Sequence, residues 1–233
     1  MFRRAATVLS LCALTAATAC SESSSPVSPT EDTAVVRAMV IGGDNQLIRV
    51  MQEGLDTLAV RFYVPSGAPV AGATVTWTLS GDGRVTAVSA QTDAAGVARA
   101  VFQAGSKSGT VTVKAALGSD DVEFVLRVQA ADPSKLEAMA MTTDTLSAGK
   151  PFNGAPVRVL DQYGNPVSDV PLTATIFAAD SDEAQAQLSL VANAEGIARL
   201  GTDVALPAGT HRLVYAFGEH TVTYQLVVMP PQD

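Results

Sequence analysis

Residues 160–172, LDQYGNPVSDVPL, place Gly164, Asn165 and Pro166 inside a segment that is otherwise apolar and rich in β-forming residues. Residues 63–75, YVPSGAPVAGATV, have the same Gly-x-Pro-Val centre 97 positions earlier. Glycine accepts positive φ angles and proline fixes its own φ, so this arrangement indicates a tight turn between two strands. Two copies of one turn predict a repeated β-rich unit.

The repeat extends well beyond this turn. Matching residues are 97 positions apart at first, and after a loop that is longer in the second copy they are 100 apart. A period near 100 residues with about seven short strands is the size of one immunoglobulin-like sandwich. We therefore expect an all-β chain with two tandem immunoglobulin-like β-sandwich domains. The first-copy residues that recur are Gly67, Pro69, Val70, Thr76, Gly96, Ala98, Arg99, Gly109, Gly118, Val122, Leu126 and Val128.

Turn residues and period-two alternation set the expected boundaries. We expect a signal peptide at 1–19, a lipidated Cys with a disordered linker at 20–33, domain 1 at 34–130, a linker at 131–134, domain 2 at 135–229 and a tail at 230–233. Val75, Trp77 and Leu79 share one strand face and are expected in the first core. Residues 181–190, SDEAQAQLSL, are expected to be a loop that enters a strand.

The N-terminus has the features of an export signal. Arg3 and Arg4 precede an apolar run, and small residues lead up to Cys20 in the sequence ATAC. This ending resembles the lipobox of bacterial lipoproteins, which implies lipidation of Cys20 and, because Ser21 follows, the outer membrane. The same small residues also fit ordinary secretory cleavage, which leaves a soluble protein. The first reading gives a membrane partner through a lipid anchor at Cys20.

Charge and composition exclude several function classes. The formal charge is −8 and becomes −10 once the two arginines of the leader are removed, which argues against nucleic acid as a partner. A content of 47% hydrophobic and 16% charged residues is that of a globular protein. The sequence indicates no cofactor, and we expect a monomer.

The two turns resemble those of the bacterial Ig-like domain of the invasin and intimin type (Big-1). The residues that carry the resemblance are VPSGAPVAGATVTWTL with TDAAGVARAVF, and VLDQYGNPVSDVPLTATI with NAEGIARL. Domain 1 has Val64 where the family usually has the Asp that Asp161 supplies in domain 2. The resemblance implies a sandwich fold and a role as a spacer or as an adhesion module.

The candidate catalytic and metal motifs lack their partners. The Ser147–Lys150 pair fits SxxK, but Pro151 follows at once and the companion motifs of serine acyl-enzymes are missing. In a hairpin around Gly218, His211 faces Leu226 and Phe217 faces His220, so the two histidines lie apart and form no shared metal site. We expect no catalytic residue, no metal site and no enzyme. Acidic loops at Asp82, at Asp120 and Asp121, and at Asp180, Asp182 and Glu183 are expected to be solvated rather than to bind calcium.

The sequence therefore favours a non-catalytic cell-envelope lipoprotein that acts as a spacer, adhesion or protein-interaction module. The main alternative, from a different class, is an accessory docking subunit of an envelope or transport assembly, and a further alternative is a carbohydrate-binding module. Its partner is an unknown protein or surface glycan. Asp161, Gln162, Tyr163 and Asn165 are not shared with the first copy, which makes them the candidate partner-binding loop.

Overall fold

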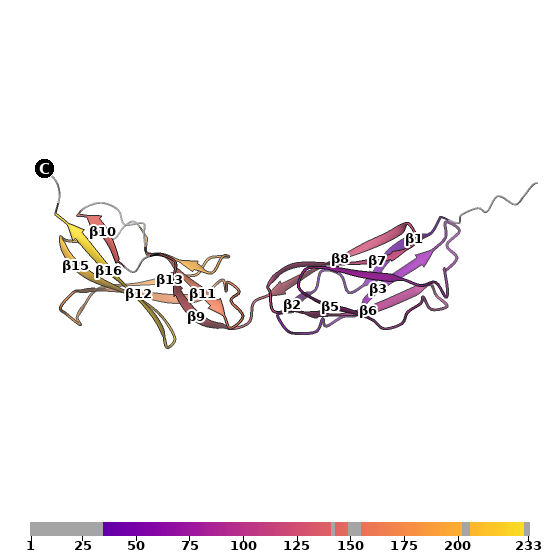
Figure 1. Ribbon diagram of the computed structural model, residues 1–233, viewed down its shortest axis with the longest axis horizontal. Coiled ribbons are helices and arrows are strands. Elements are labelled where there is room, and N and C mark those ends of the chain that lie inside the picture. Colours follow the sequence, from indigo (N-terminus) through magenta and orange to yellow (C-terminus); the bar gives the residue numbers. More distant parts are fainter. Residues whose placement is uncertain (1–34, 141–142, 149–154, 202–205, 231–233) are drawn as a thin grey trace, which may run out of the picture. The chain divides into compact units, whose positions relative to one another are not determined.

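The computed structural model describes residues 35–140, 143–148, 155–201 and 206–230 (Figure 1). Within these ranges every helix or strand is a β-strand, sixteen in total, and Val35–Asp233 form one compact unit. The same ranges contain no helix of the length and hydropathy needed to cross a membrane. The expected signal peptide, Cys20 and the linker before the first domain lie outside the described residues.

The first sandwich packs two four-stranded sheets around one core. Its hydrophobic core draws on residues from Ile48 to Val128, with Phe62, Phe102 and Phe124 as its largest fully buried side chains. The first sheet has the order β1 (Arg37–Gly42), β3 (Leu58–Tyr63), β6 (Val97–Ala104) and β5 (Gly83–Ala87). The second has the order β2 (Leu47–Arg49), β8 (Asp120–Gln129), β7 (Gly109–Leu117) and β4 (Thr76–Ser80).

The second sandwich has a separate core, built from residues between Leu136 and Leu226. Tyr215 and Tyr224 are fully buried there, with their rings edge to face. One sheet has the order β14 (Ile197–Ala198), β11 (Val157–Asp161) and β9 (Pro133–Ala138). The other has the order β10 (Thr143–Ser147), β16 (His220–Met229), β15 (Gly209–Phe217), β12 (Pro171–Ala178) and β13 (Ala184–Val191). Two tandem sandwiches are thus present, as the repeat predicts.

One strand changes sheets between the two copies. In the first sandwich β5 pairs with β6, whereas the corresponding β13 pairs with β12 in the opposite sheet. The chain from Ser80 to Gly83 spans roughly 10 Å at about 3.4 Å per residue, which is about the distance between packed sheets. The longer loop 179–183 instead turns the chain back on β12 as a hairpin. The sequence repeat alone did not predict this change of sheet. The longer loop that accompanies it is visible in the sequence, because the offset between matching residues rises from 97 to 100.

Several local expectations hold and one needs correction. His211 pairs with Leu226 and Phe217 with His220, and β13 begins within residues 181–190, the segment expected to enter a strand, and ends at Val191. Val75 is buried, but Trp77 is only partly buried and packs at the margin of the core, with its ring stacked on Phe124. The reason is that β4 is an edge strand, so one flank of Trp77 has no neighbouring strand.

Candidate functional site

The Gly-x-Pro-Val turns have the same backbone geometry in both copies. Gly67 and Gly164 both have φ of 85°. The N–H of Gly67 donates to the carbonyl of Val64 at 2.7 Å, and that of Gly164 donates to the carbonyl of Asp161 at 3.1 Å. A residue with a β-carbon is disfavoured at this φ, so glycine is needed for the backbone alone. The centre of LDQYGNPVSDVPL is therefore turn chemistry shared by both sandwiches.

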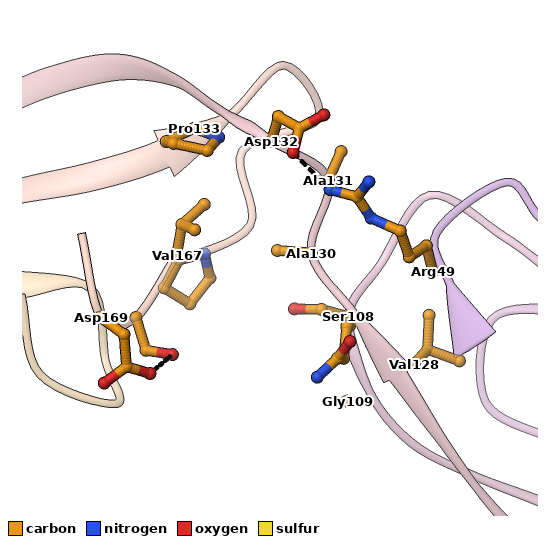
Figure 2. Close-up of a pocket in the computed structure, with 13 residues that line it drawn as sticks. Arg49, Ser108, Gly109, Val128, Ala130, Ala131, Asp132, Pro133, Val167 and Asp169 are labelled. Carbon is orange, nitrogen blue, oxygen red and sulfur yellow. Dashed lines mark hydrogen bonds and ion pairs between the residues drawn. The ribbon is translucent and has the colours of Figure 1, made fainter. Parts of the chain in front are cut away.

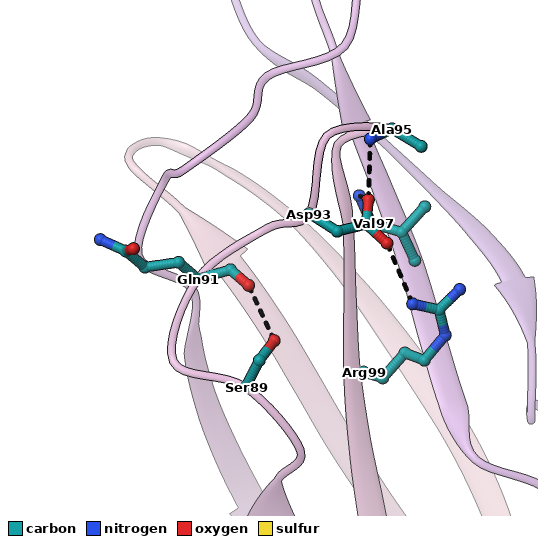
Figure 3. A network of polar contacts seen from close by, with 6 residues as sticks. All are labelled: Ser89, Gln91, Asp93, Ala95, Val97 and Arg99. Atoms are coloured by element: carbon teal, nitrogen blue, oxygen red, sulfur yellow. Dashed lines mark hydrogen bonds and ion pairs between the residues drawn. The ribbon is translucent and has the colours of Figure 1, made fainter.

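The second repeated turn is also structural (Figure 3). The Asp93 carboxylate accepts hydrogen bonds from the N–H groups of Ala95 and Val97 at 2.9 Å and pairs with Arg99. In the other copy, Oδ1 of Asn193 accepts the equivalent bonds from the backbone. Asn193 thus replaces Asp93 without loss of the turn, because both side chains offer an oxygen at the same place.

Asp161 is specific to the second copy and is almost completely buried. Its Oδ1 accepts hydrogen bonds from the N–H groups of Tyr163 and Asn165, and its Oδ2 accepts from Asn165 Nδ2 and from the N–H of Ala131, all at 2.8 Å. Burial by itself raises the pKa of this carboxyl, but hydrogen bonds from the Asn165 side chain and from backbone N–H groups outweigh it and lower the pKa below its ordinary value. Asp161 is therefore held as a carboxylate.

Asn165 extends this network to the loop between β6 and β7. Its Nδ2 donates to the carbonyl of Ser106 at 2.7 Å, and its Oδ1 accepts from the N–H of Ser108 at 2.8 Å. Together with the bond from Ala131 to Asp161, these three hydrogen bonds connect the turn of the second sandwich to residues 106–131, and we call them the joint. Val64 and Ala68 occupy the equivalent positions in the first copy and carry no such side chains.

The four residues of the candidate loop thus fall into two groups. Asp161 and Asn165 are 1% and 7% exposed and serve the joint, whereas Gln162 and Tyr163 face solvent. Gln162 and Tyr163 line a hollow of about 360 Å³ together with Arg49, Val50, Met51, Gln52, Ala131 and Asp132. Tyr163 is 43% exposed and Met51 is 49% exposed, so the hollow has two apolar side chains within reach of a partner.

A larger hollow of about 510 Å³ lies beside the joint (Figure 2). Arg49 and Asp132, at its rim, form an ion pair at 2.7 Å, and both are largely exposed. Ser108, Val167 and Asp169 also line it, and Asp169 already accepts a hydrogen bond from Ser168. Arg49 and Asp132 therefore satisfy each other, and Asp169 is bonded to the Ser168 hydroxyl. No His, Lys or Cys is among the described residues that line this hollow, so the Ser168–Asp169 pair has no third group of the kind that orients a catalytic base.

Sequence reasoning missed the partners of the joint. Ser106 and Ser108 stand in GSKSG, residues 105–109, a segment without any residue type that predicts contact with the candidate loop. They take part through backbone groups, which no residue-type pattern can reveal. The signal that was present is the difference between the copies, because Asp161 and Asn165 replace an apolar pair.

The other candidate residues lie in separate places. Ser147 ends β10, whereas Lys150 lies outside the described residues. His211 is buried and bonds to Gln185 and to the carbonyl of Pro207, while His220 stacks on Phe217. Among the residues that the structure describes, no three His, Cys, Asp or Glu side chains could hold a metal ion together. Three acidic residues of the loops expected to be solvated have partners within the protein. Asp82 accepts a hydrogen bond from the N–H of Lys107, Asp121 pairs with Lys114, and Asp182 pairs with Arg212. The other acidic residues of these loops are Asp120, Asp180 and Glu183.

Comparison with known proteins now adds to this geometry. Residues 50–126 match the model of the bacterial Ig-like domain (group 1) family. The second sandwich repeats the two turns of this Ig-like domain at Gly164 and Gly196.

Solved structures with similarity to the chain include three bacterial proteins. The Escherichia coli adhesin FdeC is 18% identical, with a TM-score of 0.41 over 83% of this chain and 63% of that one. InvD of Yersinia pseudotuberculosis is 17% identical, with a TM-score of 0.46 over 84% of this chain and 57% of that one. The adhesin InvE of the same organism is 16% identical, with a TM-score of 0.36 over 83% and 58%. The chain therefore spans less than two thirds of each of these proteins. No curated protein matches the chain.

Proposed function

We propose that this protein is a non-catalytic lipoprotein of the bacterial cell envelope, in which two Ig-like sandwiches form a spacer that also contacts a partner. The joint is the observation that carries the proposal. A linker alone leaves two domains free to swing, whereas the hydrogen bonds of Asp161 and Asn165 to Ala131, Ser106 and Ser108 oppose such motion. Ig-like domains of this kind are typically non-catalytic, and we include that character in the proposal.

The anchor is the second part of the proposal. We expect Cys20 to carry the lipid and the acyl chains to hold the protein at the outer membrane, because a protein of this net charge has little electrostatic attraction to anionic lipid. Mass spectrometry of the mature N-terminus tests this directly. A diacylglyceryl mass on Cys20 supports the anchor, and an unmodified Cys20 shows that the chain is secreted in soluble form.

The partner contact is proposed at Gln162 and Tyr163. These two residues reach solvent beside Met51, whereas Asp161 and Asn165 are occupied by the joint. An exposed tyrosine next to an exposed methionine offers an amphipathic contact of the type enriched at protein interfaces. The test is crosslinking on live cells, with Tyr163→Ala as the variant and Val88→Ala, an exposed apolar position just after β5, as the matched control. Loss of a crosslinked protein only in Tyr163→Ala supports the contact, and an unchanged pattern contradicts it.

Protease shaving of intact cells separates the proposed roles. An adhesion module faces outward and is cut, while an accessory docking subunit of an envelope assembly faces inward and is protected. Cells opened by osmotic shock are the control, because both kinds of protein are then accessible. Protection in intact cells that is lost after shock assigns the protein to the periplasmic face and favours the docking role.

A further inference from the structure

We propose that the free edge of β13 pairs antiparallel with β13 of a second copy of this chain, so that two second sandwiches share one continuous sheet. β13 is the terminal strand of its sheet, and within the part of the chain that the structure describes it pairs with β12 alone. It is eight residues long, AQAQLSLV, with no charged residue and no proline. Natural proteins usually protect edges with charges, prolines, bulges or short strands, and β13 has none of these between Gln187 and Val191.

The other edge strands of the described residues are protected. β1 has Arg37, β5 has Arg84, and β9 has Pro133, Lys135 and Glu137. The remaining edges are short: β2 has three residues, β14 has two, and β4 and β10 have five each. Among the described strands, β13 is therefore the longest edge strand without a charged residue or a proline, and it pairs in the sheet opposite to that of β5.

The backbone geometry leaves donors and acceptors at this edge. The N–H of Ala192 donates to the carbonyl of Val170, so Ala192 faces β12. Backbone groups alternate sides along a strand, and the register with β12 is regular from Ile176 and Ala186 onward. The N–H and C=O groups of Gln187, Ser189 and Val191 therefore point away from β12, toward an incoming strand.

The side chains also favour a second copy as the occupant. Leu188 and Leu190 point into the core but are only partly buried, because no strand covers their outer flank. A neighbouring strand completes their burial. The strands β12, β13, β15 and β16 contain only one Asp, Glu, Lys or Arg, namely Arg212. Two copies of a chain that is strongly negative overall can therefore approach at this sheet without opposing charges in β13.

The proposal changes the expectation of a monomer and sets the strength of the dimer. The regular edge from Gln187 to Val191 spans roughly 17 Å at about 3.4 Å per residue, and one shared strand edge of this length buries less than the roughly 1,200 Å² of a typical stable complex. We therefore expect association in the micromolar range or weaker, which becomes significant when both copies are anchored in one membrane. The pairing involves the second sandwich alone and stands independently of the proposed contact at Tyr163.

Sedimentation equilibrium tests the pairing. The chain from residue 20 onward is purified with Cys20→Ser, which leaves it without a cysteine, so that neither an acyl chain nor a disulfide joins two copies, and it is measured from about 1 µM to about 1 mM. We expect a reversible monomer–dimer equilibrium. Gln187→Pro removes a donor from the free edge and blocks the approach of a strand, while leaving the bonds to β12, so it should weaken the dimer at least tenfold.

Three controls keep the test decisive. Gln187→Thr keeps the backbone donor and should dimerise like the parent. Gln187→Lys should weaken the dimer as Gln187→Pro does, and it serves if proline lowers the melting temperature. Thr223→Lys alters the outer face of central strand β16 and should have no effect. A monomer at all concentrations, a dimer unchanged in both folded edge variants, or a dimer lost in Thr223→Lys overturns the proposal.

Discussion

Replacement of Asp161 by Asn tests the buried carboxylate with the smallest change of shape. Asp161 accepts four hydrogen bonds, two on each carboxylate oxygen. An amide has only one acceptor oxygen, so either orientation of its side chain points an NH₂ group at two donors. Two hydrogen bonds to a charged acceptor are lost, each worth about 1.5–3 kcal/mol. Since part of this loss is recovered by water at the half-buried donors, we expect Asp161→Asn to lower the free energy of unfolding by about 2–4 kcal/mol at neutral pH.

Chemical denaturation at several pH values measures this effect. The chain has a single Trp, Trp77 in the first sandwich, so its fluorescence reports on that sandwich. Near-ultraviolet circular dichroism of Tyr215 and Tyr224 reports on the second sandwich. We expect the loss of stability in the tyrosine signal. Val64→Asn, at the matching position of the first copy, replaces a residue without these bonds and is expected to change stability by less than about 1 kcal/mol.

The pH dependence has a definite sign. The pKa of Asp161 is lower in the folded state than its ordinary value, so the ionised carboxylate stabilises the fold above about pH 4. This contribution is lost as pH falls through the folded-state pKa. Asn cannot titrate, so the difference between parent and Asp161→Asn should shrink at acid pH. A difference below about 0.5 kcal/mol at neutral pH, or one that does not change with pH, contradicts the described role of Asp161.

Three further substitutions probe the second turn and the two cores. Tyr215→Phe removes the hydroxyl that accepts a hydrogen bond from the N–H of Leu200 and should lower the free energy of unfolding by about 1–2 kcal/mol. Burial raises the pKa of Tyr215 to about 12, so the phenol should stabilise the parent below about pH 10 and lose this contribution as pH rises toward 12. A variant whose stability falls with alkaline pH as the parent's does would contradict this. Gly196→Ala puts a β-carbon 2.6 Å from the carbonyl of Val159 at φ of 71° and should lower the melting temperature more than Gly164→Ala, which has the same kind of φ but open space; equal shifts would show that the contact is unimportant. Trp77→Ala should cost about 2–3 kcal/mol, less than a fully buried tryptophan because Trp77 lies at an edge, and no change in the denaturation of the first sandwich followed by circular dichroism would remove Trp77 from its core.

The fold could be predicted from the sequence because its turns repeat. Gly67 with Gly164, and Gly96 with Gly196, have matching φ angles in the two copies, and such positions depend on residue type alone. The register of the last hairpin followed from alternation around Gly218. The residue types at the turns therefore predict most of the strand order and the two-domain organisation.

The remaining features depend on neighbours that a single sequence does not reveal. β13 and β5 belong to opposite sheets because the loop before β13 is longer than the loop before β5. The sequence pattern of these strands is compatible with either neighbouring strand. The candidate loop was recognised at Asp161 and Asn165 by their difference from the first copy, but their targets are backbone groups of Ser106, Ser108 and Ala131. Backbone groups are the same in every residue, so no sequence motif marks them.

The central claim is that the joint makes the two sandwiches behave as one body. Amide ¹⁵N relaxation measured separately for residues of each sandwich tests it most directly, since the ratio of the relaxation rates gives the tumbling time of each. We predict one common tumbling time for both sandwiches in the parent protein, and two shorter and different times in Asn165→Ala, which lacks the bonds to Ser106 and Ser108. Two independent tumbling times in the parent protein would contradict the claim.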